Sequence, residues 1–143
     1  MHPGLDSKWF TYNNNPLNIN EKLGLDDSKV ILTVARLSAR KGHDAVISLI
    51  PRLITMIPDI KYLIVGEGED RERLKELVSK NGVEAYVVFA GMVSQDQLID
   101  YYDACDVFVM PSRELGNLTE GFGISFIEAG ARGKPVIGTR VGG

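Results

Sequence analysis

Glu128 is the side chain of this sequence with the strongest chemical implication. It is the only ionisable residue between Gly121 and Ala131, in the apolar stretch GFGISFIEAGA. A helix that is apolar nearly all round is a buried helix, and a carboxylate is rarely buried without a partner. On a helical wheel Glu128 falls on the same side as Ile124. The sequence therefore predicts a partner for this carboxylate, supplied either by the rest of the protein or by a ligand.

The same segment begins with a turn suited to an anion. Gly121-Phe122-Gly123 precedes the predicted helix, and Glu120 stands at its start, eight positions before Glu128. Backbone N–H groups exposed at a helix N-terminus, together with the helix dipole, favour the binding of a phosphate. For Glu120 taken alone, an interaction with the helix dipole is the simpler interpretation.

Arg36 and Lys41 are the cations best placed to bind a diphosphate. Arg36 directly follows an apolar run that predicts a buried strand, and Lys41 precedes the glycine that opens the next helix. A guanidinium offers a planar fork to phosphate oxygens, and an ammonium offers a mobile point charge. On spacing alone, two solvated loop cations are an equally good interpretation.

The turn at residues 66–71 only partly matches a dinucleotide-binding fingerprint. It reads GEGEDR, with Arg71 at the position of the third glycine and three acidic residues that would repel a pyrophosphate. We therefore interpret this turn as structural, which disfavours an oxidoreductase. No lysine-containing phosphate loop and no metal-ligand pattern is found in the sequence, so we expect no metal site and interpret His43 as a surface or cap residue.

Length and composition favour one soluble domain. A chain of 143 residues can build one hydrophobic core, and its net charge of −3 argues against a general nucleic-acid binder. One cysteine excludes a disulfide framework and favours a reducing compartment. No apolar run is long enough for a transmembrane segment. These features predict a cytoplasmic location.

Apolar runs and amphipathic segments alternate regularly from residue 30 onward. Such alternation predicts an α/β fold with a Rossmann-like parallel sheet and helices on both faces. Pro51 should bend or split the first of these helices. The expected strands are 30–35, 62–65, 87–90, 107–110 and 135–138, and the expected helices are 43–57, 70–80, 94–104 and 123–131.

The loops after the predicted strands gather positive charge. In a parallel sheet, ligands bind beyond the carboxyl ends of the strands. An otherwise acidic chain therefore presents cations at the edge where a ligand is expected, which would attract an anion such as a nucleotide. These cations are Arg36, Arg40, Lys41, Arg113 and Arg140.

Six segments carry a specific resemblance to a known family. They are VARLSARKG (34–42), IVGEGED (64–70), VVFAGMVS (87–94), DVFVMPSRE (106–114), EGFGISFIEA (120–129) and GKPVIGTRVGG (133–143). In this order they resemble the C-terminal, nucleotide-sugar-binding domain of family 4 retaining glycosyltransferases, which have the GT-B fold. The resemblance implies an enzyme that transfers a sugar from a nucleoside-diphosphate sugar to an acceptor, with retention of configuration and without a metal.

The resemblance implies roles for four charged residues. Arg36 and Lys41 would hold the donor diphosphate and stabilise the charge that develops on the leaving group, as a divalent ion does elsewhere. Glu128 would accept hydrogen bonds from the ribose hydroxyls. Glu120 would hold the transferred sugar, so that Arg36, Lys41 and Glu120 form the implied catalytic set.

Backbone groups complete the implied donor site. Those of the glycine-flanked turn would hold the sugar, and the first N–H groups of the following helix would face the phosphate. The backbone around Met92 would lie beside the base. The residues concerned are Gly121, Phe122, Gly123, Ile124, Ser125 and Met92.

The resemblance also implies a longer enzyme. Residues 1–20 lack periodicity and are expected to form a linker or N-terminal arm, packed through Trp9 and Phe10. Residues 21–143 would be the donor-binding domain, incomplete at its C-terminus. The missing N-terminal domain would bind the acceptor and would provide any peripheral contact with a membrane. Alone, the chain is expected to bind nucleotide and to lack transfer activity.

The alternative interpretation is a non-catalytic nucleotide-binding α/β module. Such a module would retain Arg36 and Lys41, but it would not need Glu120 as a sugar ligand. The two interpretations differ in whether exchange of Glu120 for alanine lowers the activity of the full-length protein. Tighter binding of NADH than of a nucleoside diphosphate would instead favour an oxidoreductase.

Overall fold

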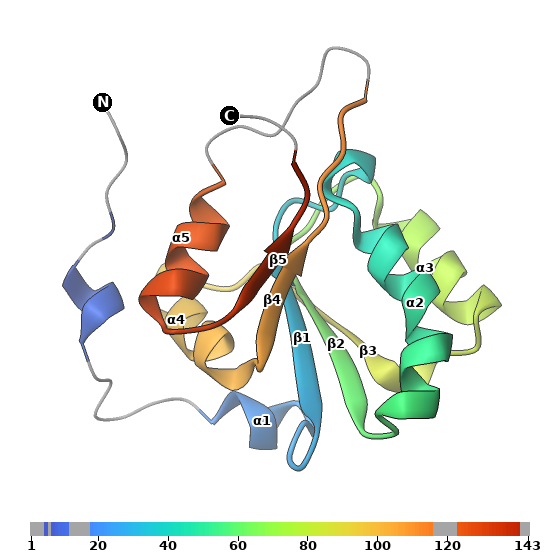
Figure 1. Ribbon diagram of the computed structural model, residues 1–143, viewed down its shortest axis with the longest axis horizontal. Helices are drawn as coiled ribbons and strands as arrows, with labels where there is room; N and C mark the ends of the chain where they lie inside the picture. Colours follow the sequence, from blue (N-terminus) through green and yellow to red (C-terminus); the bar gives the residue numbers. More distant parts are fainter. Residues whose placement is uncertain (1–4, 6, 12–17, 116–122, 141–143) are drawn as a thin grey trace.

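A parallel sheet forms the centre of the computed structural model, which describes residues 5, 7–11, 18–115 and 123–140 (Figure 1). The strands are β1 (Lys29–Val34), β2 (Ile60–Val65), β3 (Val87–Gly91), β4 (Val107–Met110) and β5 (Val136–Gly138). Within the described residues their order is β3-β2-β1-β4-β5. Because β1 pairs with both β2 and β4, the direction of strand addition reverses beside β1. Open α/β sheets bind ligands at such a switch point.

Helices cover both faces of this sheet. They are α1 (Ile19–Lys22), α2 (His43–Met56), α3 (Arg71–Lys80), α4 (Gln95–Ala104) and α5 (Ile124–Ala131), with short 3-10 helices η1 (Ser7–Phe10), η2 (Ala39–Lys41) and η3 (Glu84–Tyr86). Figure 1 shows α2 and α3 on one face, and α4 and α5 on the other together with α1. The carboxyl ends of the strands therefore lie between two helical layers.

Successive residues of each strand point to opposite faces and build two cores. Leu32 and Phe108 belong to the core under α4 and α5, whereas Ile31 and Tyr62 belong to the core under α2 and α3. Burial on both faces is the reason why these strands are continuous apolar runs in the sequence. The predicted fold class is confirmed.

The predicted helices and strands are all present, with bounds that differ by at most two residues from those expected. Ser94 is the N-cap of α4, because its hydroxyl accepts a hydrogen bond from the N–H of Gln97 at 3.2 Å. Of the two outcomes expected for Pro51, a split of α2 is wrong, since the helix continues through it, and a bend stays a prediction. Buried Ile47 and Ile50 before the proline, and half-buried Leu53 after it, hold both halves against the same face of the sheet.

Of the two aromatic residues expected to pack the N-terminal segment on the domain, one does so. Trp9 is 3% exposed and belongs to the core under α4 and α5. Arg132 donates hydrogen bonds to the carbonyl oxygens of Trp9 and Thr11, at 3.1 and 3.0 Å. The expectation for Phe10 is wrong, because its side chain is 67% exposed. In a single-turn 3-10 helix, only one of two adjacent side chains can face the core.

Candidate functional site

A cavity of about 400 Å³ lies at the carboxyl ends of β1 and β2, beside the start of α5. It combines apolar walls with charged side chains from separate loops, which is the usual composition of a small-molecule site. The sequence predicted a ligand beyond the carboxyl ends of the strands, and the cavity lies there. The lining residues are Val34, Ala35, Arg36, Val65, Gly66, Glu67, Met92, Val93, Gln95, Leu98, Ile124, Ser125 and Glu128.

The fold brings half of the expected site residues together in this cavity. They come from three separate parts of the chain: Arg36, Met92, Ile124, Ser125 and Glu128. Gly123, also expected at the site, is the N-cap of α5 and directly precedes Ile124. Lys41 ends η2 and is not among the described residues that line the cavity. Glu120, Gly121 and Phe122 lie outside the described residues.

Glu128 is the buried carboxylate that the sequence predicted, and its protein partner is Tyr102. The tyrosine hydroxyl donates a hydrogen bond to Oε1 of Glu128 at 2.8 Å. Glu128 is only 7% exposed, and Tyr102, on α4, is fully buried. The sequence had left open whether protein or ligand would supply this partner. The protein partner is a neutral phenol, which donates a hydrogen bond to the carboxylate but does not neutralise its negative charge.

Burial raises the pKa of the Glu128 carboxyl, and the hydrogen bond from Tyr102 opposes that rise. A carboxylate in this position keeps unused acceptor capacity, since its two oxygens offer about four lone-pair sites. Glu128 also lines the cavity. A ligand that donates hydrogen bonds, such as a vicinal diol, would complete its solvation.

Arg36 faces the same cavity from the end of β1. Its guanidinium donates to Oε2 of Glu69 at 2.7 Å, and both side chains are more than 60% exposed. An ion pair between two exposed side chains adds little stability and exchanges readily for another anion. Arg36 is therefore able to bind a phosphate group in place of Glu69 without disturbing the core.

The N-terminus of α5 supplies the third component of the site. Gly123 caps this helix in the left-handed conformation, with φ at 69°. The first N–H groups of a helix have no partner inside the helix, and here they belong to Ile124 and Ser125, both of which line the cavity. Ser125 is fixed to the sheet because its hydroxyl donates to the carbonyl oxygen of Val34 at 2.8 Å. A positive helix end therefore stands beside Arg36.

The glycines of the 66–71 turn allow it to approach the Arg36 loop closely, which supports its structural interpretation. A Cβ atom at Gly66 would lie 2.0 Å from the carbonyl oxygen of Ala35, and one at Gly68 would lie 2.3 Å from that of Leu37. The N–H of Leu37 also bonds the carbonyl oxygen of Glu67 at 3.0 Å. The glycines thus let two backbones run side by side at the cavity rim.

Gly66→Ala is therefore expected to destabilise the chain more than an ordinary glycine exchange. The unfolding free energy should fall by at least about 2 kcal/mol, since the new methyl group meets fixed backbone. Gly82→Ala is the matched control: Gly82 also has a positive φ, of 66°, but its Cβ would meet nothing within 4 Å. Its loss should be about 1 kcal/mol. Urea denaturation of both variants measures the difference, and equal losses would contradict the steric argument.

Arg113, one of the cations expected at the ligand edge, has a structural role. It donates to the carboxylate of Asp44 on α2 and to the carbonyl oxygen of Ala39 at 2.8 Å. Arg73 of α3 joins the same carboxylate at 3.2 Å. These contacts hold the segment after β4 against α2 and α3. The carboxylate of Asp44 thus neutralises one of the cations expected at the ligand-binding edge of the sheet.

His43 is buried, so its interpretation as a surface residue is wrong. It is the first residue of α2 and is 1% exposed. In the part of the chain that the structure describes, neither ring nitrogen has a hydrogen-bond partner. Burial lowers the pKa of His43 to about 4, although the charges of Asp70 and Asp44 oppose this. The imidazole is therefore neutral at pH 7.

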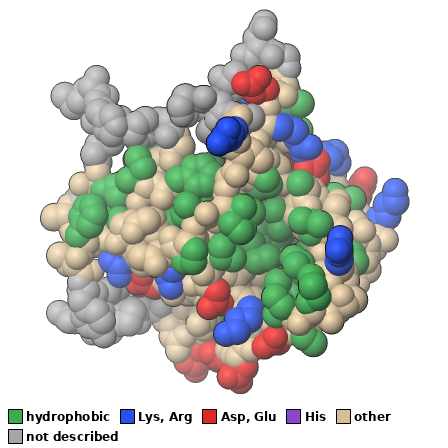
Figure 2. Space-filling view, in the orientation of Figure 1, with side chains coloured by type: hydrophobic (Ala, Val, Ile, Leu, Met, Phe, Trp, Pro, Cys, Tyr) green, Lys and Arg blue, Asp and Glu red, His purple; other side chains and the backbone are tan. Residues whose placement is uncertain are grey.

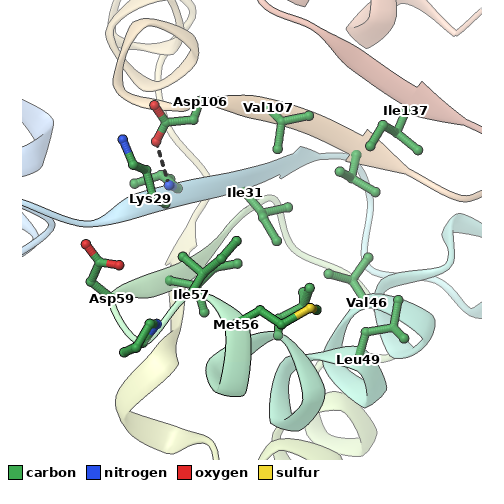
Figure 3. Close-up of a pocket in the computed structure, with 15 residues that line it drawn as sticks. Lys29, Ile31, Val46, Leu49, Met56, Ile57, Asp59, Asp106, Val107 and Ile137 are labelled. Atoms are coloured by element: carbon green, nitrogen blue, oxygen red, sulfur yellow. Dashed lines mark hydrogen bonds between the residues drawn. The ribbon is translucent and has the colours of Figure 1, made fainter.

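A larger cavity, of about 700 Å³, lies along the face between α2 and strands β1, β4 and β5 (Figure 3). Its walls are aliphatic, including exposed Leu49, Met56 and Ile137. Figure 2, in the orientation of Figure 1, shows apolar side chains across the middle of the molecular surface. The charged residues in Figure 3 belong to the amino-terminal ends of the strands, where Asp106 accepts the N–H of Val30 at 2.8 Å. The one cation among the described residues of this lining, Lys29, is accompanied by the carboxylates of Asp59 and Asp106, which disfavours a phosphate.

None of the helices in the described part of the chain combines the length and apolar character needed to cross a bilayer. Across the same residues, His, Cys, Asp and Glu side chains form no group of three or more suited to a metal ion. The free cysteine, Cys105, is buried, and burial raises the pKa of its thiol to about 11.

Comparison with protein families gives one match that spans most of the chain. Residues 17–143 match the family described as glycosyl transferases group 1. The match therefore includes every element from α1 to β5 and every residue expected at the site.

Named relatives are similar along nearly the full chain. A GDP-mannose-dependent alpha-(1-6)-phosphatidylinositol monomannoside mannosyltransferase of Mycolicibacterium smegmatis is 37% identical over 100% of this chain and 38% of its own length. An uncharacterized glycosyltransferase of Methanocaldococcus jannaschii is 38% identical over 89% of this chain and 31% of its own length.

Solved structures have the same fold. The crystal structure of HepE from Anabaena in complex with UDP-glucose superposes with a TM-score of 0.81, at 26% identity, over 98% of this chain and 38% of that one. The parallel sheet with its two helical layers is therefore the arrangement found in the C-terminal domain of GT-B glycosyltransferases. The chain spans less than two fifths of the length of each of these relatives.

Proposed function

Because the chain belongs to the group 1 glycosyl transferases, we propose that it forms the donor-binding part of a longer enzyme. That enzyme transfers a sugar from a nucleoside-diphosphate sugar to an acceptor, with retention of configuration. The names of the relatives support this class of donor: one depends on GDP-mannose and another is in complex with UDP-glucose. The two differ in nucleotide, and what they share is a nucleoside diphosphate linked to a sugar.

The observation that carries the proposal is the buried carboxylate of Glu128 at the wall of a cavity that also holds Arg36. A carboxylate accepts hydrogen bonds from a ribose diol, and a guanidinium matches a phosphate. The first residues of α5 line the same cavity as these two groups, and their N–H groups favour a phosphate. All three groups find a partner when the ribose lies at Glu128 and the diphosphate lies between Arg36 and the N-terminus of α5.

In catalysis, the bond between the sugar and the diphosphate breaks and negative charge develops on the leaving phosphate. Arg36 and the dipole of α5 stabilise that charge where it forms, which lowers the barrier. Lys41 supplies a second cation from the same loop, and its long side chain reaches toward the diphosphate when the donor is bound. Glu120 and the backbone of the Gly121-Phe122-Gly123 turn hold the transferred sugar. The base lies beside Met92, which is 75% exposed at the cavity rim.

The acceptor site belongs to the rest of the enzyme. Residues 1–20 connect it to the donor-binding domain formed by residues 21–143, and the preceding domain binds the acceptor. The chain alone therefore binds nucleotide without transferring sugar. A cytoplasmic enzyme, with any peripheral membrane contact made through the other domain, is part of the same proposal.

Isothermal titration of the chain with UDP, GDP and ADP tests the proposal. Saturable binding of at least one nucleoside diphosphate is expected, because the cavity holds both the carboxylate and the cation that such a ligand requires. A nucleotide that binds the native state should also raise the melting temperature by mass action. Absence of heat and of any thermal shift with all three nucleotides would contradict an intact donor site.

A further inference from the structure

Tyr102 connects the donor cavity to the core behind it. We propose that Tyr102 is a positioning residue for donor binding: its hydroxyl fixes the carboxylate of Glu128 in the orientation that receives the ribose hydroxyls. The inference rests on the proposed function, because it takes ribose as the ligand of Glu128.

The hydrogen bond between these residues joins two helices that both contribute side chains to the lining of the cavity. Tyr102 lies on α4 and Glu128 on α5. The tyrosine oxygen is 2.8 Å from Oε1 of Glu128 and 3.4 Å from the carbonyl oxygen of Ser125. A phenol has one proton to donate, and the shorter distance directs it to the carboxylate. One oxygen of Glu128 is thus held from behind while the side chain lines the cavity.

The tyrosine ring is itself held by a chain of aromatic contacts. The ring of Trp9 meets it edge-on at 5.6 Å between centroids, and the ring of Phe108 lies 5.8 Å away on another side. Phe108 in turn contacts Phe126 of α5 at 5.4 Å. Because Tyr102 is fully buried among these rings, its hydroxyl has a fixed position. A fixed donor determines where the carboxylate points.

A neutral donor suits this task better than a cation. A lysine or arginine at the same place would orient Glu128 but would also neutralise it and compete with the ligand. Burial raises the pKa of the Tyr102 hydroxyl, and the negative charge of Glu128 raises it further, so the phenol stays protonated. The carboxylate therefore keeps its full charge as an acceptor for the ligand.

Orientation in advance of binding has a measurable consequence. A free glutamate side chain must lose rotamer freedom when a ligand binds, and that loss lowers affinity. With Tyr102 in place, the side chain is ordered before the ribose arrives. The advantage is confined to the contact with the ribose hydroxyls, so it should vanish for a nucleotide that lacks them.

The experiment compares UDP and GDP with their 2′,3′-dideoxy forms, on the full 143-residue chain and on Tyr102→Phe. The variant keeps the ring and loses only the hydroxyl. The affinity for the ribonucleotide should fall about three- to tenfold, because the unanchored Glu128 side chain must then lose its rotamer freedom on binding. The affinity for the dideoxy form should stay unchanged, so that discrimination between the two forms decreases.

Tyr62→Phe is the matched control for general destabilisation. Tyr62 is also a fully buried tyrosine whose hydroxyl is hydrogen-bonded, to Thr33 at 2.7 Å, but it belongs to the core under α2 and α3. Melting temperatures of both variants are recorded in parallel. Loss of discrimination in Tyr102→Phe alone supports a positioning role.

Glu128→Gln separates failure of this inference from failure of the proposed function. If Glu128→Gln loses discrimination and Tyr102→Phe retains it, the ribose contact stands and the positioning role is wrong. Equal weakening of both nucleotide forms in Tyr102→Phe likewise overturns the positioning role. If Glu128→Gln still discriminates, or if the unmodified chain binds none of these nucleotides, the proposed ribose contact fails and the inference fails with it.

Discussion

Glu128→Gln is expected to weaken the binding of a ribonucleoside diphosphate by about 10- to 100-fold, since hydrogen bonds to a charged group are the stronger ones. The amide has nearly the shape of the carboxylate and still accepts a hydrogen bond from Tyr102. The fold should therefore persist, and the loss should be confined to the ligand. Titration calorimetry with UDP and GDP measures the change.

Glu76→Gln provides the control for this substitution, because Glu76 is an exposed carboxylate on α3. It should leave nucleotide affinity unchanged. Equal affinities of Glu128→Gln and the unmodified chain for UDP and GDP would mean that Glu128 does not contact the ligand.

The pH dependence of nucleotide binding and of stability in the unmodified chain tests the role of Glu128 in a second way. Burial raises the pKa of its carboxyl, and only the ionised form offers full acceptor strength to a diol. Nucleotide affinity should therefore fall as the pH is lowered through this raised pKa. The effect on stability without ligand has the opposite sign: the folded state holds the proton more tightly, so Glu128 stabilises it at low pH and this stabilisation is lost as pH rises. Both effects should be absent in Glu128→Gln.

Acidification is expected to remove about 3 kcal/mol of stability through His43. Its pKa of about 4 in the folded chain lies below the ordinary value of 6.5, because burial excludes the charged form. Between these two values the unfolded chain binds the proton and the folded chain does not. The contribution is therefore complete above the ordinary pKa and is lost as the pH falls toward the folded-state pKa.

Urea denaturation at a series of pH values between about 7 and 4 measures this loss. In His43→Leu the unfolding free energy should fall less steeply over that range, because one titrating group has been removed. Neither ring nitrogen has a partner in the described structure, so the substitution should not reduce stability at neutral pH. Parallel pH curves for the two proteins would show that His43 is accessible to protons in the folded state.

Much of the fold is determined by local pattern. Apolar runs such as 30–35 predict strands buried on both faces, and their alternation with amphipathic segments predicts the parallel sheet. The capping function of Ser94 is also local, since a hydroxyl and an N–H three residues apart decide it. Features that depend on neighbours within one turn or one strand can therefore be predicted from the sequence alone.

The candidate site is only partly determined in this way. The sequence identified Glu128 as a buried carboxylate because of its apolar surroundings within one helix. The sequence did not single out Tyr102. Its helical spacing from Leu98, four positions earlier, is compatible with an inward-facing side chain but carries no signal that its hydroxyl meets Glu128. That contact joins residues 26 positions apart on different helices. The contribution of Glu67 to the cavity likewise depends on how two loops approach each other.

The sequence by itself determined the strand and helix order, the acidic residue that needs a partner, and the edge of the sheet where a ligand belongs. Only the tertiary structure decided which partners the charged and polar groups take. In the folded chain Tyr102 is hydrogen-bonded to Glu128, Arg113 is paired with Asp44, and His43 is buried. The physical reason is range: backbone conformation follows from near neighbours, whereas the solvation of a charge depends on every group that folding brings around it.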